Sequence, residues 1–221
     1  MTRIVAGSVK GRVLKVPTKG TRPTSERVRE ALFSRLDHMG VLQGARVLDL
    51  YAGSGALGLE AASRGASKVE LVEKAPGAAK VILENIRATR LPAQCRMVSV
   101  ASFLGGRSGQ VLEGDIDLVL VDPPYDVAEE ELAQVLSLLG PWLTKDALVV
   151  VERSTRSPEP SWPGFLVLED ERRWGETTAW FAGPPLGSEE ARAFEAKVGE
   201  PDAGGDEADE SEAERAKEEH A

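Results

Sequence analysis

The chain has 221 residues, of which 42% are hydrophobic and 29% charged, the balance of an ordinary globular protein of one or two domains. No apolar stretch approaches the roughly 18 residues of a membrane span, and the polar N-terminus lacks the apolar core of a secretory signal. One cysteine excludes an internal disulfide, and with two histidines it leaves too few ligands for a structural zinc site. We therefore expect a cytoplasmic protein that works without a membrane, a metal or thiol chemistry.

The net charge of −9 is unevenly distributed along the chain. Residues 188–221 hold 13 acidic and 4 basic side chains, which accounts for the whole net charge. Residues 1–36 hold 9 basic and 2 acidic side chains, so the chain begins with a strongly basic arm. A basic arm on an acidic body suggests an extension that binds a polyanion, although a merely solvated basic surface would have the same composition.

The N-terminal segment predicts a β-hairpin followed by a helix. Alternating apolar residues in 3–7 and 11–16 flank a short polar turn, which is typical of a hairpin. After a proline-bracketed loop, Thr24 or Ser25 can cap a helix that runs to about Leu36. Val28, Leu32 and Leu36 recur every four residues and form the inner stripe of that helix.

From residue 46 the pattern changes to alternating strands and helices. We expect strands at 47–50, 69–73, 97–100, 116–121 and 147–152, with helices at 56–64, 77–89 and 129–139 between them. Continuous apolar strands separated by helices indicate a parallel sheet covered on both faces. The last two expected strands, 165–168 and 177–181, have no helix between them and predict an antiparallel hairpin.

These elements together predict an α/β fold: a mostly parallel, doubly wound sheet with a closing antiparallel hairpin and an N-terminal hairpin–helix extension. We expect the basic extension at 1–40, the main domain at 41–185 and an acidic disordered tail at 186–221, because that tail has few apolar residues to offset its ordering entropy.

A glycine loop after the first expected strand indicates a nucleotide-like ligand. Gly53 to Gly58 matches the dinucleotide fingerprint, and Glu73 follows 18 residues after Gly55, near the position that binds a ribose. A purely structural turn would have the same glycines, and Glu73 could be a surface carboxylate at a strand end. Asp49 discriminates between ligands, since its charge would repel a diphosphate but suits the sulfonium and ammonium groups of S-adenosylmethionine. Asp49 with Gly53 and Gly55 resembles the first motif of class I methyltransferases.

Asp122-Pro123-Pro124-Tyr125 follows a strand that is apolar apart from Asp117, at the place where open α/β sheets bind their ligands. The tetrapeptide resembles the signature of methyltransferases that act on exocyclic amino groups of nucleobases. Such an amine is a poor nucleophile because its lone pair is delocalised into the ring. If the Asp122 carboxylate and the Pro123 carbonyl accepted hydrogen bonds from both N–H groups, the nitrogen would favour a pyramidal geometry. Tyr125 would stack on the extruded base.

Seven segments of the chain are similar to the RsmD family of bacterial 16S ribosomal RNA guanine-N2 methyltransferases. They are Arg3–Gly7, Lys10–Arg12, Thr21–Phe33, Leu48–Glu60, Ser63–Ala66, Glu73 and Asp122–Tyr125. The resemblance covers about residues 3–183. It implies a class I (Rossmann-like) methyltransferase fold, S-adenosylmethionine as methyl donor, and one guanine of the 16S rRNA in the 30S subunit or an assembly intermediate as target. We also expect a monomer.

The resemblance assigns three sets of site residues. The catalytic set is Asp122, Pro123, Pro124 and Tyr125. The cofactor-binding set is Asp49, Tyr51, Ala52, Gly53, Ser54, Gly55, Glu73 and Ser99. The RNA-binding set is Arg3, Lys10, Arg12, Arg22, Thr24, Arg27 and Arg29, whose cations would neutralise phosphates around the flipped base. Arg35 is the first candidate for a merely solubilising cation.

Two departures and several alternatives stay open. The stretch after the third expected strand lacks an acidic residue for the adenine amine, so backbone atoms or Ser99 would read the adenine. The acidic tail lies outside the family pattern. A DNA adenine-N6 methyltransferase, a non-catalytic RNA-binding assembly factor and, third, a nicotinamide oxidoreductase are the alternative functions, and the intact motifs at Asp49 and Asp122 argue against the last two.

Overall fold

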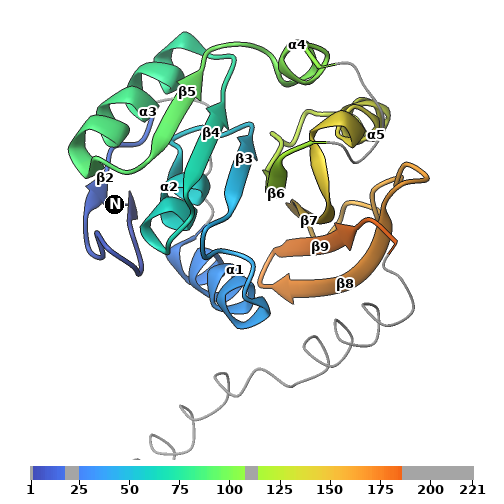
Figure 1. The fold of residues 1–221 in the computed structure, drawn as a ribbon, viewed down its shortest axis with the longest axis horizontal. Helices are drawn as coiled ribbons and strands as arrows, with labels where there is room; N and C mark the ends of the chain where they lie inside the picture. Colours follow the sequence, from blue (N-terminus) through green and yellow to red (C-terminus); the bar gives the residue numbers. More distant parts are fainter. Residues whose placement is uncertain (1, 18–24, 108–113, 186–221) are drawn as a thin grey trace, which may run out of the picture.

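The computed structural model describes residues 2–17, 25–107 and 114–185, which form an α/β fold around one seven-stranded sheet (Figure 1). The expected Arg22 and Thr24 contacts and the tail at 186–221 lie outside these residues. The sheet strands are β3 (Arg46–Leu50), β4 (Lys68–Val72), β5 (Ala93–Arg96), β6 (Ile116–Val121), β7 (Leu143–Ser154), β8 (Val167–Trp174) and β9 (Thr177–Gly183). Their order is β5-β4-β3-β6-β7-β9-β8.

The pairing of the strands confirms the predicted fold class. β5, β4, β3, β6 and β7 pair in parallel, whereas β7 pairs with β9 and β9 with β8 in antiparallel fashion. The chain leaves β3 toward β4 and β5 on one side and returns to β6 on the other, so β3 and β6 form the topological switch point of the sheet.

Helices cover both faces of the sheet, as continuous apolar strands require. α1 (Glu26–Met39), α2 (Ala56–Ser63) and α3 (Pro76–Thr89) pack on one face, and α4 (Val100–Leu104) and α5 (Glu129–Ser137) pack on the other (Figure 1). A short 3₁₀ helix, η1 (Gly140–Trp142), leads into β7.

The N-terminal segment is part of this core. β1 (Thr2–Arg3) and β2 (Val13–Leu14) pair as the predicted hairpin, and Ser25 caps α1 by accepting a hydrogen bond from the Val28 amide. Ile4 and Leu14 are buried in the same apolar cluster as Leu32 and Leu36 of α1 and the strands β3 and β6. The boundary expected near residue 40 therefore does not separate two hydrophobic cores.

The prediction for Arg35 was wrong. Its side chain is 6% exposed, forms an ion pair with Asp170 and lies 5.5 Å from the centre of the Phe181 ring. It joins α1 to the β8–β9 hairpin, an arrangement that helical periodicity alone does not reveal.

Two expected strands were misplaced because the real strands are polar edge strands. The third strand is Ala93–Arg96, whereas Met97–Val100 leads into the unpredicted helix α4. The sixth expected strand, 165–168, only overlaps β8, which runs over Val167–Trp174, because Glu169 to Arg173 give no apolar signal. β7 is longer at both ends than expected.

Candidate functional site

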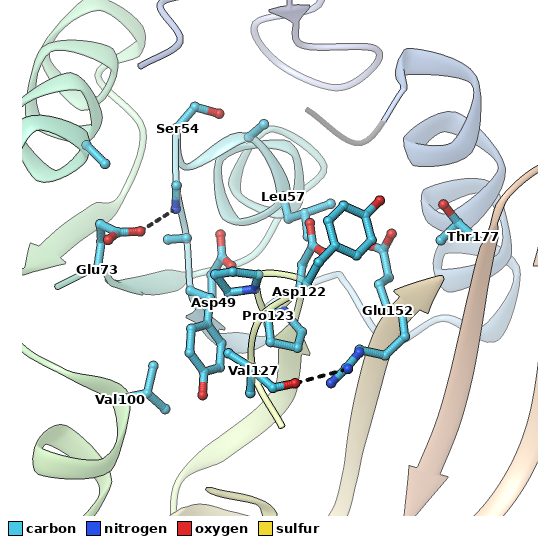
Figure 2. Close-up of a pocket in the computed structure, with 18 of the residues that line it drawn as sticks. Asp49, Ser54, Leu57, Glu73, Val100, Asp122, Pro123, Val127, Glu152 and Thr177 are labelled. Carbon is cyan, nitrogen blue, oxygen red and sulfur yellow. Dashed lines mark hydrogen bonds between the residues drawn. The ribbon is translucent and has the colours of Figure 1, made fainter. Parts of the chain in front are cut away.

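A cavity of about 830 Å³ opens at the carboxyl ends of β3, β4, β6 and β7, at the switch point of the sheet. Its volume falls within the range of roughly 300–1,000 Å³ that is typical of ligand sites. Residues of the loop after β3, the end of β4, the loop after β6, the end of β7, α1 and the β8–β9 turn line it. The positions singled out in the sequence after the first, second and fourth expected parallel strands therefore meet in one place (Figure 2).

The loop after β3 has the backbone of a ligand-binding turn. Tyr51, Gly53 and Gly55 have φ angles of 61°, 55° and 78°. All three lie in the left-handed region, which residues other than glycine rarely adopt. Tyr51 adopts this conformation although it is not a glycine, and such strain concentrates at functional sites. Tyr51, Ala52, Gly53 and Ser54, which the sequence singled out, line the cavity, whereas Gly55 caps the N-terminus of α2.

Gly58 allows α2 to approach the sheet closely. A Cβ atom at this position would lie 2.5 Å from Leu71 Cδ2, too close for any side chain. This close approach also places the Gly58 amide 2.8 Å from Asp49 Oδ2, to which it donates a hydrogen bond. The third glycine of the fingerprint thus positions a carboxylate of the site.

Asp49 is 1% exposed, and its Oδ1 atom is buried without a hydrogen-bond partner among the described residues. Burial, with smaller contributions from Asp122 and Glu73, raises the pKa of Asp49 to about 8, against the opposing hydrogen bond from Gly58. An unpartnered buried carboxyl group at the wall of a cavity suits a cationic ligand group, because a positive charge would both pair with the oxygen and favour its ionised form.

Glu73 is tied into the loop after β3 by two backbone hydrogen bonds. Its Oε2 accepts from the Gly53 amide at 2.9 Å (Figure 2), and its Oε1 accepts from the Ala75 amide at 2.7 Å. Each carboxylate oxygen has a second lone pair, so Glu73 can still accept from hydroxyl groups of a ligand. The structure places it in the cavity wall at the end of β4, where the sequence predicted a ribose contact.

Asp122, Pro123, Pro124 and Tyr125 lie directly after β6 and line the same cavity. The turn is closed by the Val127 amide, which donates to the Pro124 carbonyl at 3.1 Å. Pro123 is buried, whereas the Tyr125 side chain is 68% exposed, unusually so for a large aromatic residue. An exposed ring on a rigid turn is available to stack against a planar ligand.

Ser99 has a different position from the one predicted. It caps α4, where its hydroxyl accepts from the Ser102 amide at 3.2 Å and is 2.8 Å from Ser102 Oγ. Val100 and not Ser99 is among the residues that line the cavity. The sequence left two candidates for recognition of an adenine, backbone atoms and the Ser99 side chain. This arrangement favours backbone atoms.

Glu152, which the sequence did not single out, lies near the end of β7, two residues before Ser154. Its side chain is 3% exposed, and neither carboxyl oxygen has a hydrogen-bond partner among the described residues. Burial, with Asp122 and Asp49 nearby, raises its pKa well above the ordinary value, and Arg29 opposes this shift. The available signal was that an acidic residue ends an apolar strand at the ligand-binding edge of the sheet.

Arg29 is a correction to the expected RNA contacts. Its side chain is 1% exposed, its Nη2 donates to the Arg3 carbonyl at 2.5 Å, and its Nε lies 3.8 Å from Glu60 Oε2. Burial lowers its pKa, against the opposing effects of Glu60, Glu26 and Glu152. An arginine held inside the protein in this way is not a surface phosphate contact. It lines the cavity and ties α1 to the site.

The other expected RNA contacts among the described residues are on the surface. Arg3, Lys10, Arg12 and Arg27 are exposed. Arg3 forms an exposed ion pair with Glu26, at 3.2 Å. Among these same described residues, no helix has the length and apolarity that a membrane crossing requires, and no cluster of three or more metal-ligating side chains is found.

Comparisons with known proteins identify relatives over most of the chain. A family model described as Conserved hypothetical protein 95 matches residues 2–183. The chain is 36% identical over 179 residues to the Ribosomal RNA small subunit methyltransferase D of Escherichia coli K12, covering 79% of this chain and 85% of the relative. The protein of the same name from Haemophilus influenzae is 35% identical over 170 residues, covering 76% and 87%.

Two solved structures also superpose on most of this chain. The yhhF protein of Escherichia coli superposes with a TM-score of 0.71 at 32% identity, covering 83% of this chain and 97% of that one. The Thermus thermophilus protein TTHA0928 superposes with a TM-score of 0.69 at 33% identity, covering 82% and 98%.

Proposed function

The chain belongs to the RsmD family, whose sequence model is described as Conserved hypothetical protein 95, and from this membership we propose that it transfers a methyl group from S-adenosylmethionine to the exocyclic N2 amine of a guanine in 16S ribosomal RNA. The target lies in the 30S subunit or an assembly intermediate in the cytoplasm. The observation that carries the proposal is the meeting of Asp49, Glu73 and Asp122–Tyr125 around one cavity.

The residues of the cavity fit S-adenosylmethionine. The orphaned Oδ1 of Asp49 suits a cationic group of the donor, and Glu73 can accept from ribose hydroxyls while it holds the loop after β3. Tyr51, Ala52, Gly53 and Ser54 offer a backbone that a ligand can approach closely. When bound, the donor supplies a methyl group on a positively charged sulfur, which is electrophilic without further activation.

The chain's own contribution to the reaction is to prepare the amine. The Asp122 carboxylate and the Pro123 carbonyl accept hydrogen bonds from the two N–H groups and so direct the nitrogen lone pair away from the aromatic ring. The N–C bond would form as the bond from the methyl carbon to sulfur breaks, which would leave a neutral thioether, and Asp122, which already accepts one N–H, would take the proton that the methylated nitrogen loses. Because this geometry is needed most in the transition state, the interaction accelerates methyl transfer more than it strengthens binding. Tyr125 stacks on the extruded guanine and holds it in the cavity.

The exposed cations of the N-terminal hairpin bind the RNA around that guanine. Lys10 and Arg12 lie on a surface loop whose fold is anchored to α2, and neutralised phosphates contribute affinity independent of sequence. Arg3 of β1 and Arg27 of α1 add two further exposed cations.

The experiment that tests the function compares three substrates under one set of conditions. Purified protein and labelled S-adenosylmethionine are incubated with 30S subunits that lack the modification, with duplex DNA, and with neither. We expect label in 16S rRNA, recovered as N2-methylguanosine after digestion. Label in DNA as N6-methyladenine would favour the DNA enzyme, and S-adenosylmethionine binding without transfer to any substrate would favour the non-catalytic assembly factor.

A further inference from the structure

Glu152 is the buried acidic group of the cavity to which the proposed chemistry assigns no task. Its two carboxyl oxygens have no hydrogen-bond partner among the described residues, although its side chain is 3% exposed. A buried polar group without a partner is costly, and in native proteins it calls for a specific explanation. Because Glu152 lines the ligand cavity, a bound ligand is the partner that could satisfy it.

The register of the sheet places Glu152 beside Asp122. Val121 of β6 pairs with Val151 of β7, so the next residues on the two strands are neighbours, on strands about 4.8 Å apart. Side chains of paired residues point to the same face of a sheet, and the Asp122 and Glu152 carboxyl groups point the same way in the cavity (Figure 2). Leu120 is two residues before Asp122 and therefore points to the same face of the sheet. Asp49 pairs with Leu120, so its side chain lies on this face as well.

The alternative partner of Glu152 is Arg29, which approaches from α1. Arg29 acts on the charge of Glu152, but its guanidinium contacts Glu60 and the Arg3 carbonyl. The guanidinium thus contributes positive potential and leaves both oxygens of Glu152 without a hydrogen-bond partner among the described residues.

Guanine presents to such a pair of carboxyl groups an arrangement that other bases lack. Beside its N2 amine it carries the N1–H, a second donor on the same edge. Adenine and cytosine carry an acceptor nitrogen beside their amine. Two adjacent acceptor groups therefore match two adjacent donors of guanine and leave an acceptor facing an acceptor with the other two bases.

We infer that Glu152 is a specificity-determining residue that accepts the guanine N1–H while Asp122 and the Pro123 carbonyl hold the N2 amine. The inference rests on the proposed function, since it requires a guanine in the cavity. Hydrogen bonds from the base would favour the ionised form of a carboxyl group that burial otherwise disfavours.

The test replaces the target guanine, once it has been mapped, by two analogues in 16S rRNA reconstituted into 30S subunits. 2-Aminopurine keeps the amine at position 2 but has an acceptor at N1, whereas 6-thioguanine keeps both the amine and the N1–H and alters only the O6 position. We expect wild-type kcat/KM to fall about ten- to a hundredfold on 2-aminopurine, the effect of removing one hydrogen bond to a charged group, and much less on 6-thioguanine.

Glu152→Gln supplies the decisive comparison, because its amide can donate to the acceptor N1 of 2-aminopurine. We expect this variant to lose activity on guanine. The ratio of its kcat/KM on guanine to its kcat/KM on 2-aminopurine should be at least tenfold smaller than that of the wild type. Glu130→Gln, the same change at an exposed position of α5 outside the cavity, should keep the wild-type ratio. A purely structural role would lower both rates of Glu152→Gln together and leave the ratio unchanged.

An unchanged ratio in Glu152→Gln overturns the inference, whatever its absolute activity. Should the variant not fold, the wild type decides alone, since equal rates on guanine and 2-aminopurine equally overturn it. Absence of transfer to guanine-bearing subunits by the wild type contradicts the proposed function itself, which is a separate outcome.

Discussion

Three carboxyl groups on one face of the sheet, from Asp49, Asp122 and Glu152, give the site its chemical character. Asp49 and Glu152 are almost completely buried, and each has at least one oxygen without a hydrogen-bond partner among the described residues. Burial, with a smaller contribution from the nearby Asp122, raises the pKa values of both groups. These carboxyl groups therefore suit ligands that carry positive charge and N–H donors.

Variants of the tetrapeptide separate the roles of its two side chains. Asp122→Ala should abolish turnover with the donor still bound, because in the proposed reaction the carboxylate engages the target amine and not the donor. Asp122→Asn should be milder, since its amide oxygen can accept one N–H. Tyr125→Phe should keep most activity, whereas Tyr125→Ala should lose roughly 1–3 kcal/mol of stacking. Single-turnover rates on 30S subunits measure the order; Asp122→Ala at the wild-type rate would remove the tetrapeptide from the mechanism.

Asp49 predicts a pH dependence of stability whose sign follows from its raised pKa. The folded protein keeps the proton of Asp49 up to a pH of about 8, while the unfolded chain releases it near its ordinary pKa of 3.8. The wild type therefore loses stability as the pH rises through this window. Asp49→Asn cannot titrate but can still accept from Gly58, so its melting temperature relative to wild type should rise between pH 5 and pH 8.

The control for this experiment is Asp146→Asn, which changes an exposed aspartate at the opposite edge of the sheet and should show a difference that is flat with pH. A flat difference for Asp49→Asn as well would mean that Asp49 is ionised in the folded protein throughout this range.

At the scale of elements, Glu60 of α2 joins the N-terminal segment to the methyltransferase sheet. Its carboxylate accepts from the Val5 amide at 2.7 Å and the Ala6 amide at 3.0 Å, and it pairs with Arg64 at 2.8 Å. Arg29 of α1 lies 3.8 Å away. The basic hairpin is thereby anchored to the helix that follows the glycine loop.

Glu60→Gln should destabilise the protein by about 3–5 kcal/mol, because it leaves the buried Arg29 guanidinium without the carboxylate that it pairs with, whereas Arg64 keeps Asp37. Thermal unfolding measures the loss, and hydrogen exchange should show the Val5 and Ala6 amides opening first. Glu84→Gln, which removes only the exposed ion pair with Lys15, should change the melting temperature little. Equal stability of Glu60→Gln and wild type would contradict the anchoring role.

The exposed cations of the hairpin predict salt-dependent RNA binding. The double variant Lys10→Ala/Arg12→Ala should bind 30S subunits more weakly and reduce the slope of log affinity against log salt by roughly 0.7–0.9 for each phosphate that is no longer neutralised. Affinity for S-adenosylmethionine should not change. The matched double variant Lys68→Ala/Lys145→Ala removes two cations from near the amino ends of β4 and β7 and should keep the wild-type slope. Equal slopes for both would make the hairpin a solvated surface.

The elements show which parts of the fold a sequence can predict. Buried parallel strands such as β6 and β3 are mostly apolar, with one aspartate each, and their bounds were predicted to within one residue. The edge strands β5 and β8 are polar, so the pattern placed them on neighbouring apolar segments. An edge strand is defined by its hydrogen bonds to one neighbour, which composition does not record.

At the scale of the whole molecule, the sheet brings to one cavity residues that are distant in the sequence. Asp49, Glu73 and Asp122–Tyr125 could be predicted because each ends a strand within a local motif. Arg29 could not, because its role depends on how α1 packs across the sheet, and Glu152 gave only the weak signal of an acidic residue at the end of an apolar run, since its role depends on how β7 pairs with β6. A basic residue in a basic segment looks like a surface contact until tertiary packing buries it.

The most direct measurement of the central claim is quantitative mass spectrometry of 16S rRNA nucleosides from a strain that lacks this protein. We predict the loss of one N2-methylguanosine per 16S rRNA, restored by the wild-type chain and not by Asp122→Ala produced at the same level. Unchanged N2-methylguanosine at every position of the 16S rRNA in the deletion strain would contradict the account.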